Sequence, residues 1–179
     1  MKISRPLLSF IILAWMLIQC SPDPKSRIRE LEKEISSENF SLDEKGIRTA
    51  EELIQAYVSY AESHKEGPEA PEYLYHAADL SLNINKSKES LELYNRIIYQ
   101  YPDFVKVPEC LFLVGYITEN YMQNYGKARE IYESFIAKYP QHDFADDAAI
   151  SIENMGKSPE ELIRAIEEKN RQQQDTLHL

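Results

Sequence analysis

Histidine and cysteine are the side chains in this sequence that could ligate a metal ion or serve as nucleophile and base, and they are few. The four histidines, His64, His76, His142 and His178, never lie three or four residues apart, the spacing that places two ligands on one helix face. The two cysteines are too few for a disulfide framework or a cysteine-rich zinc site. No Gly-x-Ser-x-Gly, Walker or dinucleotide-binding pattern occurs. The sequence therefore predicts a protein that is not an enzyme and that uses no metal and no cofactor.

The charge balance argues against a further class of partner. The chain of 179 residues has 20 Lys and Arg against 30 Asp and Glu, which gives a formal net charge of −10. Binding to nucleic acid needs a basic surface that neutralises phosphates, so nucleic acid is not expected as a partner. A hydrophobic content of 43% is ordinary for a globular protein.

The first twenty residues have the pattern of a targeting segment. Lys2 and Arg5 give a positive start, and residues 7–18 form an apolar run. A membrane-spanning helix needs about 20 apolar residues, so this run fits a secretory signal better than a membrane span. The run ends in Leu17-Ile18-Gln19-Cys20, and polar residues follow at once.

This arrangement resembles the signal of a bacterial lipoprotein, in which a leucine such as Leu17 stands three residues before the lipidated cysteine. The resemblance implies that residues 1–19 are a signal peptide and that Cys20 becomes an acylated N-terminus, which holds the protein to a membrane through covalent lipid. Ser21 after the cysteine implies, by the same analogy, the outer membrane of a Gram-negative bacterium, facing the periplasm. From the residues alone, an uncleaved anchor helix ending at a cysteine remains the alternative.

Both ends of the chain are expected to be loosely packed. Residues 20–41 are predicted to form the lipidated N-terminus and a tether, because a charged helix over residues 27–37 would have only a thin apolar stripe of Ile28, Leu31 and Ile35. Weak packing or disorder is expected there. Residues 171–179 are polar and are expected to fray.

Between these ends the sequence repeats itself with a period of 37 to 38 residues. Ala70-Pro71-Glu72 recurs as Val107-Pro108-Glu109, and Tyr101-Pro102 recurs as Tyr139-Pro140. The apolar spacing is helical throughout, and no sustained alternation calls for strands. We therefore predict an all-α fold, a short right-handed solenoid of antiparallel helix hairpins over residues 42–170, with about two full repeats, partial flanking repeats and a capping helix.

Individual residues mark where these helices begin, cross and end. Pro108 suits a first helical turn, Tyr139-Pro140 ends a helix, and Gly115 is expected where two helices approach most closely. Cys110 is expected as a small buried side chain within a helix. Ser158-Pro159-Glu160-Glu161 predicts the start of the capping helix, whose Leu162, Ile163 and Ile166 are expected to pack back on the last hairpin.

At these residues the sequence resembles the tetratricopeptide repeat family. The matching positions are Leu74, Ala78, Ser90, Tyr94 and Pro102 in one unit and Leu111, Gly115, Ala128, Tyr132 and Pro140 in the next. The long period, the Tyr-Pro helix end and the segment Phe144 to Ala148 are similar to periplasmic repeat lipoproteins of the β-barrel assembly and Tol-associated type. The resemblance implies a fold of stacked hairpins and a protein or peptide partner.

The candidate partner-binding residues are those expected on the concave face formed by the first helix of each hairpin. By register they are Glu72, Tyr75, Asp79, Glu109, Phe112, Tyr116 and Glu119. Aromatic anchors with an acidic rim suit a segment that carries Lys or Arg. The alternative is that these side chains pack against the first helices of the adjacent repeats. Tyr94, Tyr101, Tyr132 and Tyr139 recur at equivalent positions and are expected to pack in the core and between repeats.

Together these observations predict a membrane-anchored lipoprotein that serves as a protein–protein interaction module or scaffold in the bacterial cell envelope. One alternative is an accessory factor for outer-membrane protein assembly or envelope maintenance. Another is a purely structural homo-oligomer, in which the aromatic face meets a second copy of the chain.

Overall fold

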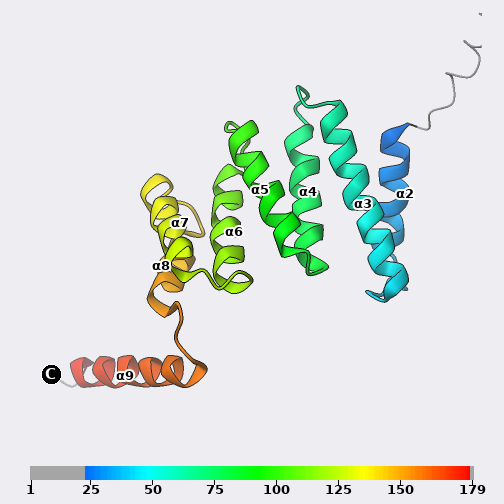
Figure 1. Cartoon of the computed structure of the whole chain (residues 1–179). Coiled ribbons are helices and arrows are strands. Elements are labelled where there is room, and N and C mark those ends of the chain that lie inside the picture. Colours follow the sequence, from blue (N-terminus) through cyan, green and yellow to red (C-terminus); the bar gives the residue numbers. More distant parts are fainter. Residues whose placement is uncertain (1–22, 178–179) are drawn as a thin grey trace, which may run out of the picture. The chain divides into compact units, whose positions relative to one another are not determined.

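The computed structural model of this chain describes residues 23–177, and every regular element within that range is a helix (Figure 1). The predicted signal peptide and Cys20 lie outside the described residues. The all-α prediction is confirmed. The helices fall into two compact units, Met1–Ile84 and Asn85–Leu179, and each unit is described by itself.

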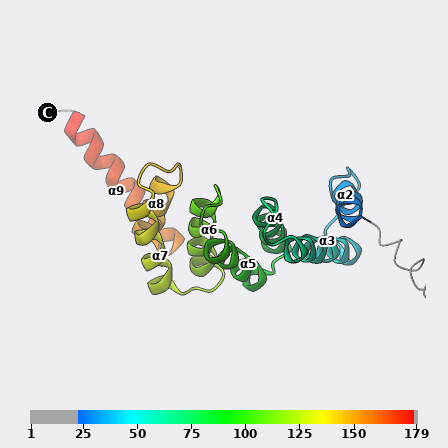
Figure 2. The same ribbon diagram turned by 90° about the horizontal axis from the view of Figure 1, so that it is seen from above.

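The first unit contains α2 (Pro24–Ile35), α3 (Glu44–Ser63) and α4 (Ala70–Asn83). Helix α3 lies between the other two and packs against both, and Figure 2 shows the three side by side. Asp43 caps α3, because its carboxylate accepts a hydrogen bond from the backbone N–H of Gly46 at 2.9 Å.

The prediction of a loosely packed tether is wrong for α2. Ile28 and Leu31 are 2% and 1% exposed, and α2 packs along α3. The apolar stripe is thin, as the sequence shows, but Ile28 and Leu31 are covered and Ile35 is half-buried. Two buried side chains one helical turn apart therefore contribute to seating the helix.

The second unit contains α5 (Ser87–Gln100), α6 (Val107–Asn120), α7 (Tyr125–Lys138), α8 (Ala145–Asn154) and α9 (Pro159–Leu177). Helix α6 packs against α5 and α7, and α7 also packs against α8. Tyr132 and Phe135 of α7 are fully buried, and partly buried side chains of α6 and α8, among them Phe112 and Ile152, surround them. The predicted burial of Cys110 is confirmed.

The loop that joins one hairpin to the next has the same hydrogen bonds three times, which is the structural counterpart of the 37- to 38-residue period. In each copy the carbonyl of the residue just past a helix accepts a hydrogen bond from the backbone N–H three positions later. The carbonyl of that later residue in turn accepts a hydrogen bond from the N–H of the first residue of the next helix. The three copies begin at His64, Tyr101 and Tyr139 and lead to Ala70, Val107 and Ala145. Tyr101 and Tyr139 also have nearly equal backbone angles, with φ of −131° and −130°.

Helix crossing in the second unit depends on Gly115, as predicted. A Cβ atom added there would lie 2.8 Å from Cε1 of the Tyr132 ring, closer than carbon atoms approach without strain. Tyr132 is fully buried, and so is Tyr94, its counterpart 38 residues earlier. Both tyrosines are therefore buried side chains of a helix in the second unit.

The last helix differs from its prediction in two respects. Its start is as expected, because Glu161 N donates to Ser158 Oγ at 3.2 Å while Ser158 N donates to Glu161 Oε2 at 2.7 Å. However, Ile163 and Ile166 are 57% and 59% exposed instead of packed on the last hairpin. Their apolar stripe spans little more than one turn before the sequence becomes polar, so docking would bury little surface. The helix also continues to Leu177, past residue 170, because neither Gly nor Pro interrupts it.

Candidate functional site

The seven residues of the predicted partner-binding face lie on two helices. Glu72, Tyr75 and Asp79 are on α4 in the first unit, and Glu109, Phe112, Tyr116 and Glu119 are on α6 in the second unit. Both sets are at the surface, half-buried or exposed. They differ in what surrounds them within their own unit.

The α4 set lies beside aromatic side chains of the first unit. His76 is on the same helix, with its Nε2 3.5 Å from Glu72 Oε1 and its ring edge-on to that of Tyr75. On its other side His76 meets Tyr57 of α3, with 5.8 Å between ring centroids. These contacts give α4 an aromatic and acidic surface of the predicted composition.

Phe112 of the α6 set is a packing residue. Its ring lies 5.6 Å from that of Tyr132, 5.8 Å from that of Phe135 and 4.7 Å from that of Phe144. Phe144 directly precedes α8, so Phe112 joins three consecutive helices of the unit. The contact with Phe144 fits the packing alternative, whereas Tyr132 and Phe135 lie on α7, the second helix of the same hairpin.

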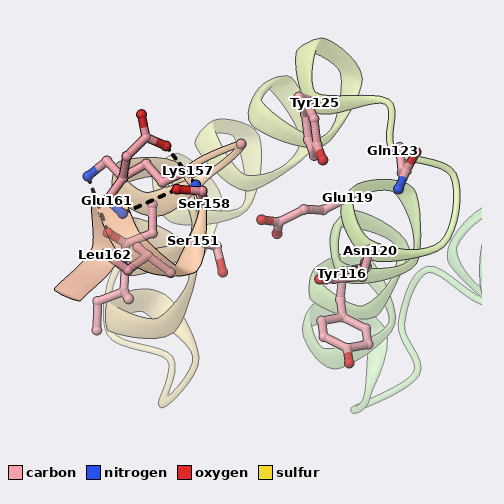
Figure 3. Close-up of a pocket in the computed structure, with 13 residues that line it drawn as sticks. Tyr116, Glu119, Asn120, Gln123, Tyr125, Ser151, Lys157, Ser158, Glu161 and Leu162 are labelled. Atoms are coloured by element: carbon pink, nitrogen blue, oxygen red, sulfur yellow. Dashed lines mark hydrogen bonds between the residues drawn. The ribbon is translucent and has the colours of Figure 1, made fainter.

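Tyr116 and Glu119, in contrast, line a cleft of about 580 Å³ in the second unit (Figure 3). Its walls come from the C-terminal half of α6, the start of α7, the second half of α8, and the loop into α9 with the first turn of that helix. The other lining residues are Asn120, Gln123, Tyr125, Ile150, Ser151, Asn154, Gly156, Lys157, Ser158, Glu161 and Leu162. Two of the seven predicted residues therefore share a hollow large enough for several side chains of a peptide.

Aromatic and aliphatic surface is exposed in this cleft. Tyr116 is 39% exposed and stands edge-on to Tyr121, with 6.2 Å between ring centroids. Tyr125 and Ile150 are 44% and 54% exposed. When a partner covers large, half-exposed side chains, their apolar surface is removed from water. Burial of such surface is the usual source of affinity at binding sites.

The charged groups of the cleft are held in place by neighbours. Glu119 accepts a hydrogen bond of 2.9 Å from the Tyr132 hydroxyl, and Glu161 accepts one from the backbone of Ser158. Lys157 Nζ donates to Asn154 Oδ1 at 3.3 Å. The cleft thus contains two carboxylates and one amine, a net negative charge that suits a basic ligand.

The hydrogen bond between Tyr132 and Glu119 also alters the tyrosine. Burial raises the pKa of the Tyr132 hydroxyl well above its ordinary value, and the adjacent Glu119 carboxylate raises that pKa further. Tyr132 therefore remains a protonated donor through the physiological range. It holds Glu119 at the edge of the cleft, where Figure 3 shows the carboxylate directed toward α8 and α9.

Sequence reasoning missed most of the cleft. Tyr125, Ile150 and Gly156 lie outside the face predicted from helix register, and α9 was expected to cover the last hairpin instead of forming a wall. Gly156 has a φ of 78°, in the left-handed region that favours glycine. That glycine, which lies just before the helix start predicted at Ser158-Pro159, was a sequence signal for a turn there.

Within residues 23–177 no group of three or more His, Cys, Asp or Glu side chains is placed to hold a metal ion. Over the same range, no helix combines the length and apolar character needed to cross a bilayer.

The tetratricopeptide repeat family matches the chain twice, over residues 72–103 and 109–142. These are the two full units predicted from the sequence period. A comparison with curated proteins finds none that matches the chain. The repeats indicate a protein–protein interaction module with a protein partner, and members of this repeat family are generally scaffolds without enzymatic activity.

Proposed function

We propose that this protein is a membrane-anchored lipoprotein that binds a protein or peptide partner in the bacterial cell envelope. The lipid is attached at Cys20, and the outer membrane facing the periplasm is the proposed location. Two matches to tetratricopeptide repeats support the interaction role, and the pattern of residues 1–20 supports the anchor.

The observation that carries the binding proposal is the cleft of about 580 Å³ in the second unit, because it gathers Tyr116 and Glu119 of the predicted face. Its exposed rings and Ile150 supply apolar contact, while Glu119 and Glu161 supply negative charge. A segment with an apolar side chain beside a Lys or Arg satisfies both features.

Photo-crosslinking in cells tests this site and identifies the partner in the same experiment. A crosslinkable residue at Gln123, which lines the cleft, is expected to capture a protein, and Tyr116→Ala is expected to reduce that capture. Loss of a central aromatic contact costs about 2 kcal/mol, or roughly 30-fold in Kd. Tyr99→Ala is the matched control, because Tyr99 is 80% exposed and is outside the cleft lining. Equal capture by a folded Tyr116→Ala variant would reject the site.

The crosslinked product also distinguishes a foreign partner from a second copy of the chain. A product with twice the mass of the protein, together with a dimer in light scattering, would favour the homo-oligomer. A distinct partner that binds less tightly as ionic strength rises would support the acidic cleft as a site for basic side chains.

The anchor is tested separately by membrane fractionation and by the mass of the N-terminal peptide. The unaltered chain is expected in the membrane fraction with an acylated Cys20. Cys20→Ala is expected to lose the acyl groups. Recovery of the unaltered chain without acyl groups would refute the lipoprotein assignment while leaving the binding proposal in place.

A further inference from the structure

Helix α2 begins at the fourth residue after Cys20, the proposed lipidation site. A chain of four residues spans at most about 14 Å when fully extended. The inference that follows rests on the proposed lipidation. It concerns how closely the first unit is held to the bilayer.

The start of α2 is fixed to the α3–α4 loop by a cluster of polar contacts. Lys25 Nζ lies 2.8 and 2.7 Å from the two carboxylate oxygens of Glu69, the residue that precedes α4. The Tyr60 hydroxyl donates to the same carboxylate at 2.9 Å, and Lys25 Nζ stands 5.3 Å from the centre of the Tyr60 ring. The start of α2, the end of α3 and the loop between α3 and α4 are therefore held together at the Glu69 carboxylate.

Further contacts continue along the helix and prevent α2 from lifting away. Arg27 Nη2 lies 2.6 Å from Glu52 Oε1 on α3, and the Tyr57 hydroxyl donates to Glu32 at 2.8 Å. Beneath these pairs, Ile28 and Leu31 are buried. Each such side chain contributes about 1.5–3 kcal/mol when it is removed from water. Helix α2 is thus an integral part of the first unit.

The cations at the start of α2 are already neutralised within the protein. Lys25 pairs with Glu69, Arg27 pairs with Glu52, and Arg29 Nη2 lies 3.2 Å from the Asp23 carboxylate. The segments at this end, residues 23–30 and 62–69, together hold four Lys or Arg against five Asp or Glu, a net charge of −1, in a chain with a formal net charge of −10. A nearly neutral end can approach a bilayer without the repulsion that anionic lipids exert on the rest of the chain.

We infer that the start of α2 and the α3–α4 loop form a membrane-apposed end of the first unit, and that its partner is the lipid surface itself. The acyl chains at Cys20 provide the attachment, and the short chain between Cys20 and Pro24 limits the separation. The opposite end of the unit, where α2 turns into α3, then points away from the bilayer. The first unit is held close to the membrane and in one orientation.

Quenching of a fluorophore by quenchers attached to lipid headgroups measures this orientation in the full lipidated chain. The label is placed at Glu66→Cys in the α3–α4 loop or at Glu38→Cys beyond the end of α2, and both positions are exposed. Cys110 is fully buried and stays unlabelled. We expect at least about twofold more quenching at position 66, since the 12 residues of α2 separate the two ends by about 18 Å.

Three altered chains show whether the short connection to Cys20 and the contacts of α2 cause the difference. A flexible Gly-Ser spacer inserted between Ser21 and Pro22 leaves the Asp23 cap of α2 and its pair with Arg29 in place. This spacer is expected to make quenching at the two positions equal. Leu31→Asp is expected to do the same by releasing α2 from α3, while Lys33→Asp, at an exposed position of the same helix, is expected to preserve the difference. A difference that survives the spacer would overturn the inference.

Failure of this inference differs from failure of the proposed anchor. An acylated, membrane-bound chain with equal quenching at positions 66 and 38 would overturn the orientation alone. A chain that carries no acyl group would overturn both the lipoprotein assignment and the membrane-apposed end. Equal results in neutral and anionic vesicles would support the neutral character of that end, whereas a strong dependence on anionic lipid would contradict it.

Discussion

Replacing Gly115 by alanine tests the closest helix approach in the second unit. Within an open helix, Gly→Ala stabilises by about 1 kcal/mol because alanine restricts the unfolded chain and favours the helix. At Gly115 the new methyl group would lie 2.8 and 2.9 Å from two carbon atoms of the Tyr132 ring and 3.3 Å from Ile131 Cγ2. The sign of the effect therefore depends on whether that ring can move.

The Tyr132 ring has little freedom to yield. It is fully buried, it packs against Phe112, and its hydroxyl is hydrogen-bonded to Glu119. Overpacking in such a site costs about 1–3 kcal/mol. After the gain of about 1 kcal/mol in helix propensity is subtracted, we expect Gly115→Ala to lower the free energy of unfolding by up to about 2 kcal/mol.

Urea denaturation followed by far-UV circular dichroism measures this change. Gly126→Ala is the matched control, because a Cβ atom at Gly126, on α7 of the same unit, would meet no atom within 4 Å. That variant is expected to be as stable as the unaltered chain or more stable, by up to about 1 kcal/mol. If Gly115→Ala stabilised the protein like the control, the close approach of α6 to Tyr132 would be refuted.

Four further changes test other contacts. Ser90→Ala is expected to raise the free energy of unfolding by about 1 kcal/mol, and with it the urea midpoint, because the buried Ser90 Oγ has no hydrogen-bond partner among the described residues. A lower midpoint would contradict this. Leu31→Ala is expected to destabilise the first unit by about 2–5 kcal/mol, and an unchanged midpoint would show that α2 is not seated on α3. Because the pKa of Tyr132 is raised in the folded state, its protonated hydroxyl contributes fully to the free energy of unfolding below about pH 10, the ordinary tyrosine pKa. That contribution is lost as pH rises through the pKa of the folded state. Tyr132→Phe should therefore reduce the loss of stability at alkaline pH. Hydrogen bonds from Lys25 and Tyr60 lower the pKa of Glu69. The ionised carboxylate therefore contributes to the free energy of unfolding above about pH 4.3, the ordinary glutamate pKa, and this contribution is lost on acidification. Glu69→Gln should flatten acid unfolding, and an unchanged acid profile would argue against this carboxylate as a cause.

The sequence alone was sufficient for the class of fold and for many helix ends. The copies of the Tyr-Pro helix end predicted that helices stop at equivalent places, and α5 and α7 do stop directly before Tyr101 and Tyr139. Ser158 and Glu161 likewise predicted the start of α9. These features depend on residues a few positions apart, so they can be recognised from short segments of the chain.

The candidate site was only partly predictable. Helix register predicted Tyr116 and Glu119 on one face of the helix, and both line the cleft. The same register could not distinguish them from Phe112, which packs against Phe144. Which residues of a helix face are covered depends on the angle and distance of neighbouring helices, and helix periodicity does not contain that information.

Tertiary structure alone decided how both ends of the folded part are arranged. Two apolar residues seat α2 because α3 provides a surface that fits them, whereas Ile163 and Ile166 of α9 remain exposed. The two stripes look similar in the sequence. Local residue patterns determine whether a segment becomes a helix, but burial depends on whether another segment presents complementary apolar surface at the right place, and only the folded chain brings such distant segments together.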